Sequence, residues 1–142
     1  PQAAKDDWSG DTGVGGQYFS QDAVIRLAPA AGISLSEMLT PAEKLSAVQE
    51  LAAAGDPRAL AIFRDIGVYL GHTLPLYAGV YELKNLMVLG RVASGIGGEL
   101  IVSECRRVLA EEYPALRVSV TLPDEQFRRV GQSVAAASLP EV

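Results

Sequence analysis

The chain is poor in the residues from which catalytic and metal sites are most often built. It has one cysteine, Cys105, and one histidine, His72, in 142 residues. A single cysteine forms no disulfide within the chain, which favours a reducing compartment, and we expect a cytoplasmic protein. One histidine far from one cysteine provides neither a zinc site nor a nucleophilic triad. We therefore predict no metal ligands and treat His72 as a hydrogen-bonded core or boundary residue.

Clusters of positive charge and long apolar runs are also missing. The net charge is -5, and the pairs Arg106-Arg107 and Arg128-Arg129 are interpreted as solvated helix faces, so no nucleic-acid partner is expected. The longest uncharged run, residues 66–81, is shorter than the roughly 18–20 residues that cross a bilayer, so no membrane partner is expected. No signal peptide is visible, and the start PQAAKDDW without methionine indicates the middle of a longer protein.

The whole chain, residues 1–142, has the composition of one compact α/β domain. The chain is 49% hydrophobic and 20% charged. Residues 1–20 contain Gly10, Gly13, Gly15 and Gly16 and are predicted as an irregular glycine-rich segment. Residues 21–142 are predicted as the helical and α/β core.

Three helices are predicted in the first part of this core. The first covers residues 21–30 and stops near Pro29. The second begins at Thr40-Pro41-Ala42-Glu43, which has the residues of a capping box, and ends at Gly55. The third begins at Asp56-Pro57.

The third helix has apolar residues at helical spacing as far as Tyr81. Gly67 and Gly71 lie four residues apart and share a face that another backbone can approach closely. Pro75 is expected to kink or interrupt the helix, because it removes a backbone donor.

The rest of the core alternates strands and helices. Residues 86–89 form a continuous apolar run, which predicts a strand covered on both faces. A helix is expected over 98–112, a second strand over 116–122, and a last helix from Asp124. Right-handed crossovers would place both strands in a parallel or mixed sheet flanked by helices.

The turn between the first strand and its helix is the candidate functional site. It reads GRVASGIGG over residues 90–98. Glycines at a helix N-terminus allow a ligand to approach free backbone N–H groups and the positive end of the helix dipole. The candidate cofactor-binding residues are Gly90, Arg91, Ala93, Ser94, Gly95 and Gly97. A tight turn without a ligand is the alternative, and Ser94 either caps the helix or donates to a phosphate or ribose.

Several segments resemble the C-terminal half of the ROK family of bacterial sugar kinases and repressors. They are GDPRALAIF, NLMVLGRVAS, GELIVSECRRVL and FRRVGQSVAAASL, and the likeness covers nearly the whole chain. The resemblance implies that this chain is the C-terminal lobe of an actin/hexokinase-like (ribonuclease H-like) kinase fold. It also implies Mg-ATP as cofactor, with adenosine at residues 90–98, a hexose as substrate, and a homodimer or a missing N-terminal lobe as partner.

The chain departs from the family pattern at several positions. Asp7, Ser9 and Val14 stand where the family's zinc loop has cysteines, so no zinc is expected. The family's sugar-contacting glutamate falls at Gly16, and Arg91-Val92 replace glycines of the adenosine turn.

No segment matches the family's catalytic aspartate, so we expect no catalytic residue in this chain. The resemblance implies the nucleotide-binding and dimerisation half of an ATP-dependent hexose kinase, inactive without its N-terminal lobe. The alternative is a non-catalytic sugar-sensing regulator or a degenerate assembly module.

Overall fold

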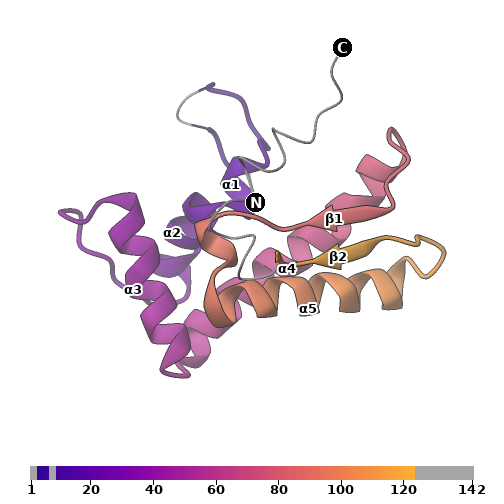
Figure 1. The fold of residues 1–142 in the computed structure, drawn as a ribbon. Coiled ribbons are helices and arrows are strands. Elements are labelled where there is room, and N and C mark those ends of the chain that lie inside the picture. The colour runs from indigo at the N-terminus through magenta and orange to yellow at the C-terminus, as the bar shows by residue number, and fades with distance from the viewer. Residues whose placement is uncertain (1–2, 7–8, 124–142) are drawn as a thin grey trace, which may run out of the picture.

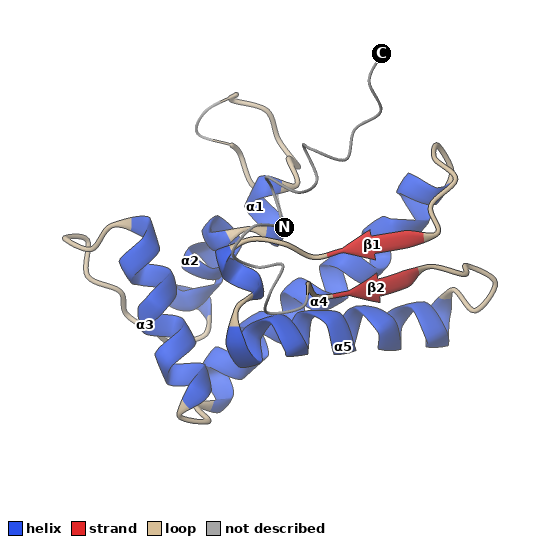
Figure 2. Cartoon of the chain, in the orientation of Figure 1, coloured by secondary structure: helices blue, strands red, loops and turns tan. Residues whose placement is uncertain are grey.

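The computed structural model describes residues 3–6 and 9–123. The elements follow in the order α1 (Gly16–Phe19), α2 (Gln21–Ala30), α3 (Pro41–Ala53), α4 (Pro57–Ala78), β1 (Asn85–Met87), η1 (Arg91–Ala93), α5 (Gly95–Glu112) and β2 (Ser119–Thr121) (Figure 1). Helices and a small parallel sheet make this broadly an α/β chain, as Figure 2 shows. Of the helices in the described ranges, none is both long and apolar enough to cross a membrane.

The helix starts predicted at Thr40-Pro41 and at Asp56-Pro57 are confirmed. The Thr40 hydroxyl accepts a hydrogen bond from the Glu43 N–H, and the Glu43 carboxylate accepts one from the Thr40 N–H at 2.8 Å, which completes the capping box. Asp56 caps α4 by accepting a hydrogen bond from the Arg58 N–H at 2.9 Å. Gly55, at φ +84, has the left-handed conformation expected after the end of α3.

The helix pair α4–α5 forms the centre of the fold. A Cβ added to Gly71 would lie 2.7 Å from Val108 Cβ, so the small face at Gly67 and Gly71 is where α5 packs on α4. Phe63, Ile66, Ile101 and Cys105 are all buried at this contact or beside it. The predicted close approach is therefore confirmed, and it occurs within this chain.

Two features describe the end of α4. The helix continues through Pro75 to Ala78, so Pro75 does not interrupt it. Tyr81 lies beyond the helix and is exposed, although its spacing placed it on the apolar face. Gly79 follows the last helical residue, and glycine has low helix propensity.

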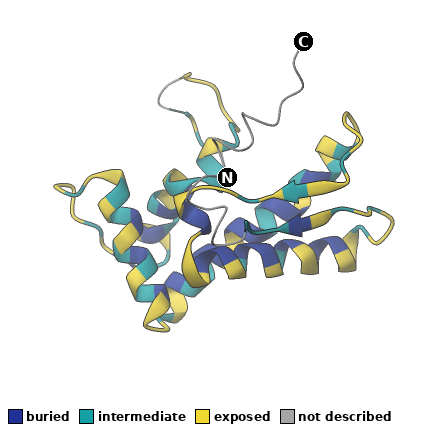
Figure 3. Cartoon of the chain, viewed as in Figure 1, coloured by how far each residue is buried: buried dark blue, intermediate teal, exposed yellow. Residues whose placement is uncertain are grey.

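The sheet has two parallel strands within the described residues, paired Asn85 with Ser119, Leu86 with Val120 and Met87 with Thr121. The expectation that the first strand is covered on both faces is wrong. Met87 is 55% exposed and Leu89 52% exposed, whereas Leu86 and Val88 pack against the core. In Figure 3 the buried residues gather where the helices and the sheet meet. The other face of β1 is open because no described element packs over it.

Other boundaries also shift. One short helix, α1, forms within the segment predicted as irregular, and α5 begins at Gly95 rather than at residue 98. The strands are shorter than the apolar runs that predicted them, because ladder hydrogen bonds pair only three residues of each. The helix predicted from Asp124 lies outside the described residues.

Candidate functional site

The glycine turn begins with a backbone conformation that requires glycine. Gly90 has φ +101 and ψ 174, a region that side chains rarely adopt. A Cβ built on Gly90 would meet no atom within 4 Å, so the space above it is open. Glycine is thus needed here for the direction of the chain, and the open space leaves the backbone accessible.

Gly90 and Arg91 line a hollow of about 420 Å³. Its opposite wall is the start of α2, where Ser20 is the N-cap and accepts a hydrogen bond from the Asp22 N–H at 3.0 Å. Asp22 of α2 lines the same hollow, and both Arg91 and Asp22 are exposed. The wall of the hollow therefore includes one cationic and one anionic residue.

The middle of the turn is buried. Val92 is 5% exposed and Ala93 is 3% exposed, and both belong to the single 3-10 turn η1. A Cβ on Gly98 would collide with the Ala93 carbonyl, so the turn packs directly on the first turn of α5. Ala93 therefore packs against the first turn of α5, and its buried side chain does not face a ligand.

The N-terminus of α5 is open to solvent and to ligands. Ser94 is the N-cap residue, but its side chain makes no capping hydrogen bond, and no acidic residue lies in the first turn. Gly95, at φ +58, is exposed and has no atom within 4 Å of an added Cβ. The first N–H groups of an α-helix lack intrahelical partners, and the exposed Gly95 and Ile96 let a ligand approach the positive end of the helix dipole.

This helix end faces a second hollow, of about 250 Å³, whose far wall is α3. One side is lined by the start of α5, Ser94 to Gly97 with the apolar Ile96, and the other side is lined by polar or small residues of α3: Ser46, Gln49, Glu50 and Ala53. The Gln49 amide donates to the Arg91 carbonyl at 2.9 Å and so ties α3 to η1.

Sequence reasoning missed the α3 wall. The signal was present, because residues 46, 49, 50 and 53 share one helical face beside the buried face of Leu45, Val48 and Ala52. A polar helix face is normally solvated, and only the tertiary structure brings this one against the glycine turn. The six predicted site residues are thus divided: two line the hollow at α2, three line the hollow at α3, and Ala93 lies buried between them.

Gly97 also has a structural role. A Cβ there would lie 2.7 Å from Phe63 Cδ1 in the core, so glycine is required for α5 to pack on α4. A substitution at Gly97 would therefore disturb folding as well as the site.

The N-terminal loop, where the sequence resemblance leads us to expect no zinc, is held by its own hydrogen bonds. The Asp6 N–H donates to the Asp11 carbonyl at 2.8 Å, and the Ser9 N–H donates to the Asp6 carboxylate at 2.8 Å. Residues Lys5 and Thr12 form an antiparallel bridge. Within the described residues, no group of three or more histidine, cysteine, aspartate or glutamate side chains is arranged to hold a metal ion.

The single histidine and the single cysteine lie away from the glycine turn. His72 Nδ1 is 3.1 Å from the Tyr113 hydroxyl, so the predicted hydrogen bond is present, but the side chain is exposed on α4 and the predicted core or boundary position is wrong. Cys105 is fully buried on the core face of α5, and burial raises the pKa of its thiol to about 11. The thiol is therefore protonated at neutral pH and has little nucleophilic character.

Comparisons with protein-family models, with curated proteins and with solved structures find no match to this chain.

Proposed function

We propose that this chain is the nucleotide-binding and dimerisation half of an ATP-dependent hexose kinase that resembles the ROK family. The observation that carries the proposal is the uncapped N-terminus of α5, which opens onto the hollow lined by α3. The sequence resemblance predicts adenosine at this turn, and the hollow offers glycine backbone and the exposed Ile96 on one wall and three polar residues and Ala53 of α3 on the other.

The residues of the hollow suit the adenosine part of a nucleotide. Gly95 lets the ligand approach the backbone closely, and the free N–H groups after Ser94 donate to acceptor atoms of the ligand. The Glu50 carboxylate and the Ser46 hydroxyl, 3.4 Å apart, lie one helical turn from each other and can accept from ribose hydroxyls. Gln49 holds α3 in position through its bond to Arg91.

In the complete kinase, bound Mg-ATP would supply the phosphoryl group that is transferred to a hexose hydroxyl. Such catalysis depends mainly on positioning and on stabilisation of charge. Residues of this chain would orient the nucleoside and form one wall of the cleft. The base that accepts the sugar proton is assigned to the other lobe, so the isolated chain is expected to bind nucleotide without transferring phosphate.

A second candidate is a non-catalytic relative that senses sugar or serves assembly. Val92 favours it, because this side chain is buried where the family has a glycine and so fills space beneath the turn. Arg91, exposed at the neighbouring hollow, is the other departure. A protein of this type would keep the fold of the turn and lose the response to nucleotide.

The test is an amide NMR titration of the chain with Mg-ATP. We expect shifts at Ser94–Gly98 and at Ser46–Glu50, and none at residues of the α4 C-terminus. Ala53→Trp, which fills the hollow, should weaken binding about tenfold or more. Ala54→Trp is the matched control, because Ala54 is an exposed C-cap residue that does not line the hollow.

A folded spectrum that does not respond to Mg-ATP would contradict the kinase proposal and favour the non-catalytic candidate. Equal weakening by the two tryptophan variants would show that the nucleotide binds elsewhere. Shifts limited to residues 89–92 and 19–22 would move the site to the hollow at α2.

A further inference from the structure

A hollow of about 380 Å³, here called the α5–β2 hollow, lies between the C-terminal half of α5 and the segment that leads into β2, at the right of Figure 1. Its size lies within the range of about 300–1,000 Å³ that is usual for ligand pockets. Apolar residues make up much of its wall, among them Leu109, Leu116 and Val118. Arg106 and Arg117 also line it, and no aspartate or glutamate does so among the described residues.

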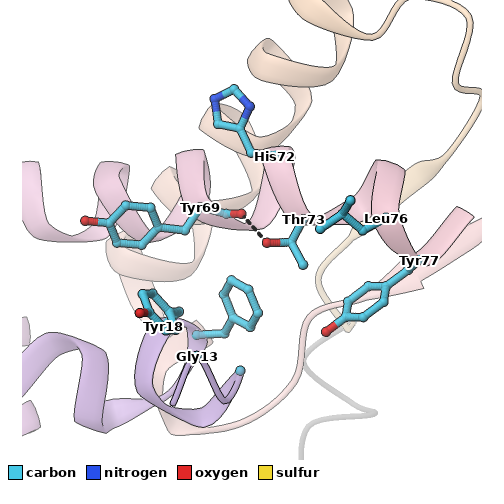
Figure 4. A pocket seen from close by; sticks show the side chains of 9 residues that line it. Gly13, Tyr18, Tyr69, His72, Thr73, Leu76 and Tyr77 are labelled. Atoms are coloured by element: carbon cyan, nitrogen blue, oxygen red, sulfur yellow. Dashed lines mark hydrogen bonds between the residues drawn. The ribbon is translucent and has the colours of Figure 1, made fainter. Parts of the chain in front are cut away.

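The charge of the α5–β2 hollow differs from that of the hollows at α2, α3 and α4. The α2 hollow contains both Arg91 and Asp22, and the described residues of the α3 hollow include Glu50 but no lysine or arginine. The described residues that line the cavity at α4 include no lysine, arginine, aspartate or glutamate; Figure 4 shows Tyr69 and Tyr77 extending from α4 at its wall. Of these four spaces, the α5–β2 hollow is the one whose described wall has arginines and no carboxylate.

The charge of Arg106 is not neutralised by a carboxylate of the described residues. Its Nε and Nη2 donate to the Val120 carbonyl, which carries no net charge, and its Nη1 makes no hydrogen bond within the described part of the chain. The positions one helical turn away, 102, 103, 109 and 110, hold no acidic residue. The next residue, Arg107, is the contrast, because it pairs with Glu104 at 2.7 Å and Glu111 at 2.6 Å.

Arg117 provides a second positive charge to the same hollow. Its side chain is exposed and makes neither an ion pair nor a hydrogen bond with any residue that the structure describes. The whole chain carries a net charge of -5, so two arginines without carboxylate partners make a local exception to the overall charge. A small anion is therefore attracted to this hollow although the chain as a whole repels it.

We propose that the α5–β2 hollow binds a small organic carboxylate with an apolar body. Arg117 donates to the carboxylate with its planar guanidinium, and Arg106 adds its Nη1 while its other donors stay on the Val120 carbonyl. The apolar wall covers the body of the ligand. A single carboxylate suits the site better than a larger anion, because only one of the two guanidinium groups is entirely free of protein acceptors among the described residues. This site is additional to the nucleotide site and shares no residue with the α3 hollow.

The first test is an amide NMR titration of the full chain with hexanoate at constant ionic strength. We expect shifts at residue 110 and at residues 116–119, and none at the start of α5. Acetate, which lacks the apolar body, and 1-hexanol, which lacks the charge, should each bind at least about tenfold more weakly. Binding of 1-hexanol as tight as that of hexanoate, or the absence of hexanoate shifts at these residues, would overturn the proposal.

Arg117→Gln tests the charge without disturbing a described contact. It should raise the dissociation constant for hexanoate at least about fivefold, because a charge-assisted hydrogen bond at an exposed site is lost. Arg107→Gln is the matched control: it makes the same charge change at an exposed arginine that does not line the hollow. Equal dissociation constants for the two variants would mean that hexanoate responds only to the net charge of the chain, and the proposal would be wrong.

Ala110→Trp tests the hollow itself without changing the charge. Ala110 is exposed and lines the hollow, so the indole should fill it and weaken hexanoate binding at least about tenfold. Ala115→Trp is the control, because Ala115 is equally classed as exposed and does not line the hollow. Circular dichroism checks that both variants keep their helices, and hexanoate binding that is the same in both would contradict the assigned location.

Discussion

Gly67 of α4 lies directly against the backbone of Ile101 in α5. A Cβ on Gly67 would be 2.6 Å from the Ile101 carbonyl oxygen and 2.8 Å from Glu104 Cβ. The first of these neighbours is main chain, which cannot rotate away. The closest approach of the two central helices therefore depends on the absence of one methyl group.

Gly67→Ala should destabilise the protein by about 1–3 kcal/mol, the usual cost of overpacking a core, although alanine has the higher helix propensity. Urea denaturation followed by circular dichroism measures this change. Gly16→Ala is the control, because a Cβ at Gly16 meets no atom within 4 Å and the residue does not have a positive φ. If both variants were equally stable, the helices would be farther apart than described.

Arg106 donates hydrogen bonds to the outer edge of β2. Its guanidinium donates from Nε and Nη2 to the Val120 carbonyl, with the Nε–O distance 2.9 Å, and Val120 is buried. Arg106→Met keeps the aliphatic stem but leaves this carbonyl without its donors, so stability should fall by about 1–3 kcal/mol.

The neighbouring Arg107→Met provides the comparison. Arg107 pairs on the surface with Glu104 at 2.7 Å and Glu111 at 2.6 Å. Exposed ion pairs of this kind contribute about 0–1 kcal/mol, so urea denaturation should show the smaller loss for Arg107→Met. The reverse order would mean that β2 does not need the bond from Arg106.

The Asp56 carboxylate should make stability depend on pH in an acidic window. Hydrogen bonds from the Arg58 guanidinium and N–H lower the pKa of Asp56 from 3.8 to about 2. A lowered pKa contributes stability that is complete above the unfolded value and is lost as pH falls through the folded value. The loss attributable to Asp56 should therefore fall between about pH 4 and pH 2.

Asp56→Asn isolates this charge effect, because asparagine still accepts the capping hydrogen bond from the Arg58 N–H. Thermal denaturation between pH 2 and pH 7 should show that the variant loses less stability than the parent in the acidic window. Parallel pH profiles for the two proteins would show that Asp56 is not paired with Arg58 in solution.

The Cys105 thiol should be unreactive while the protein is folded. Burial raises the pKa of Cys105 from 9.0 to about 11, so the thiolate is scarce at pH 8 and reagents cannot reach it. A raised pKa contributes stability that is present below pH 9 and is lost as pH rises toward 11. Labelling with a chromogenic disulfide at pH 8 should be slow in buffer and rapid in denaturant. Fast labelling of the folded chain would contradict the burial of Cys105.

The sequence by itself determined the features that depend on neighbouring residues. Thr40 with Glu43 and Asp56 before Pro57 mark helix starts, because a cap bonds backbone groups only two or three residues away. Gly55 marks a helix end by its left-handed conformation. The pair Gly67 and Gly71 predicts a close-packing face, because helical spacing alone places the two glycines together.

Long-range packing sets which faces are covered and which residues meet across the fold. The apolar run at 86–89 predicts burial on both sides, yet Met87 and Leu89 are open, because burial depends on which elements pack over a strand. Gln49 reaches Arg91 across 42 positions of sequence, a contact that no local pattern encodes. The sequence predicts the glycine turn as a candidate site because its chemistry is local, whereas the division of its residues between two hollows depends on the docking of α2 and α3 on either side.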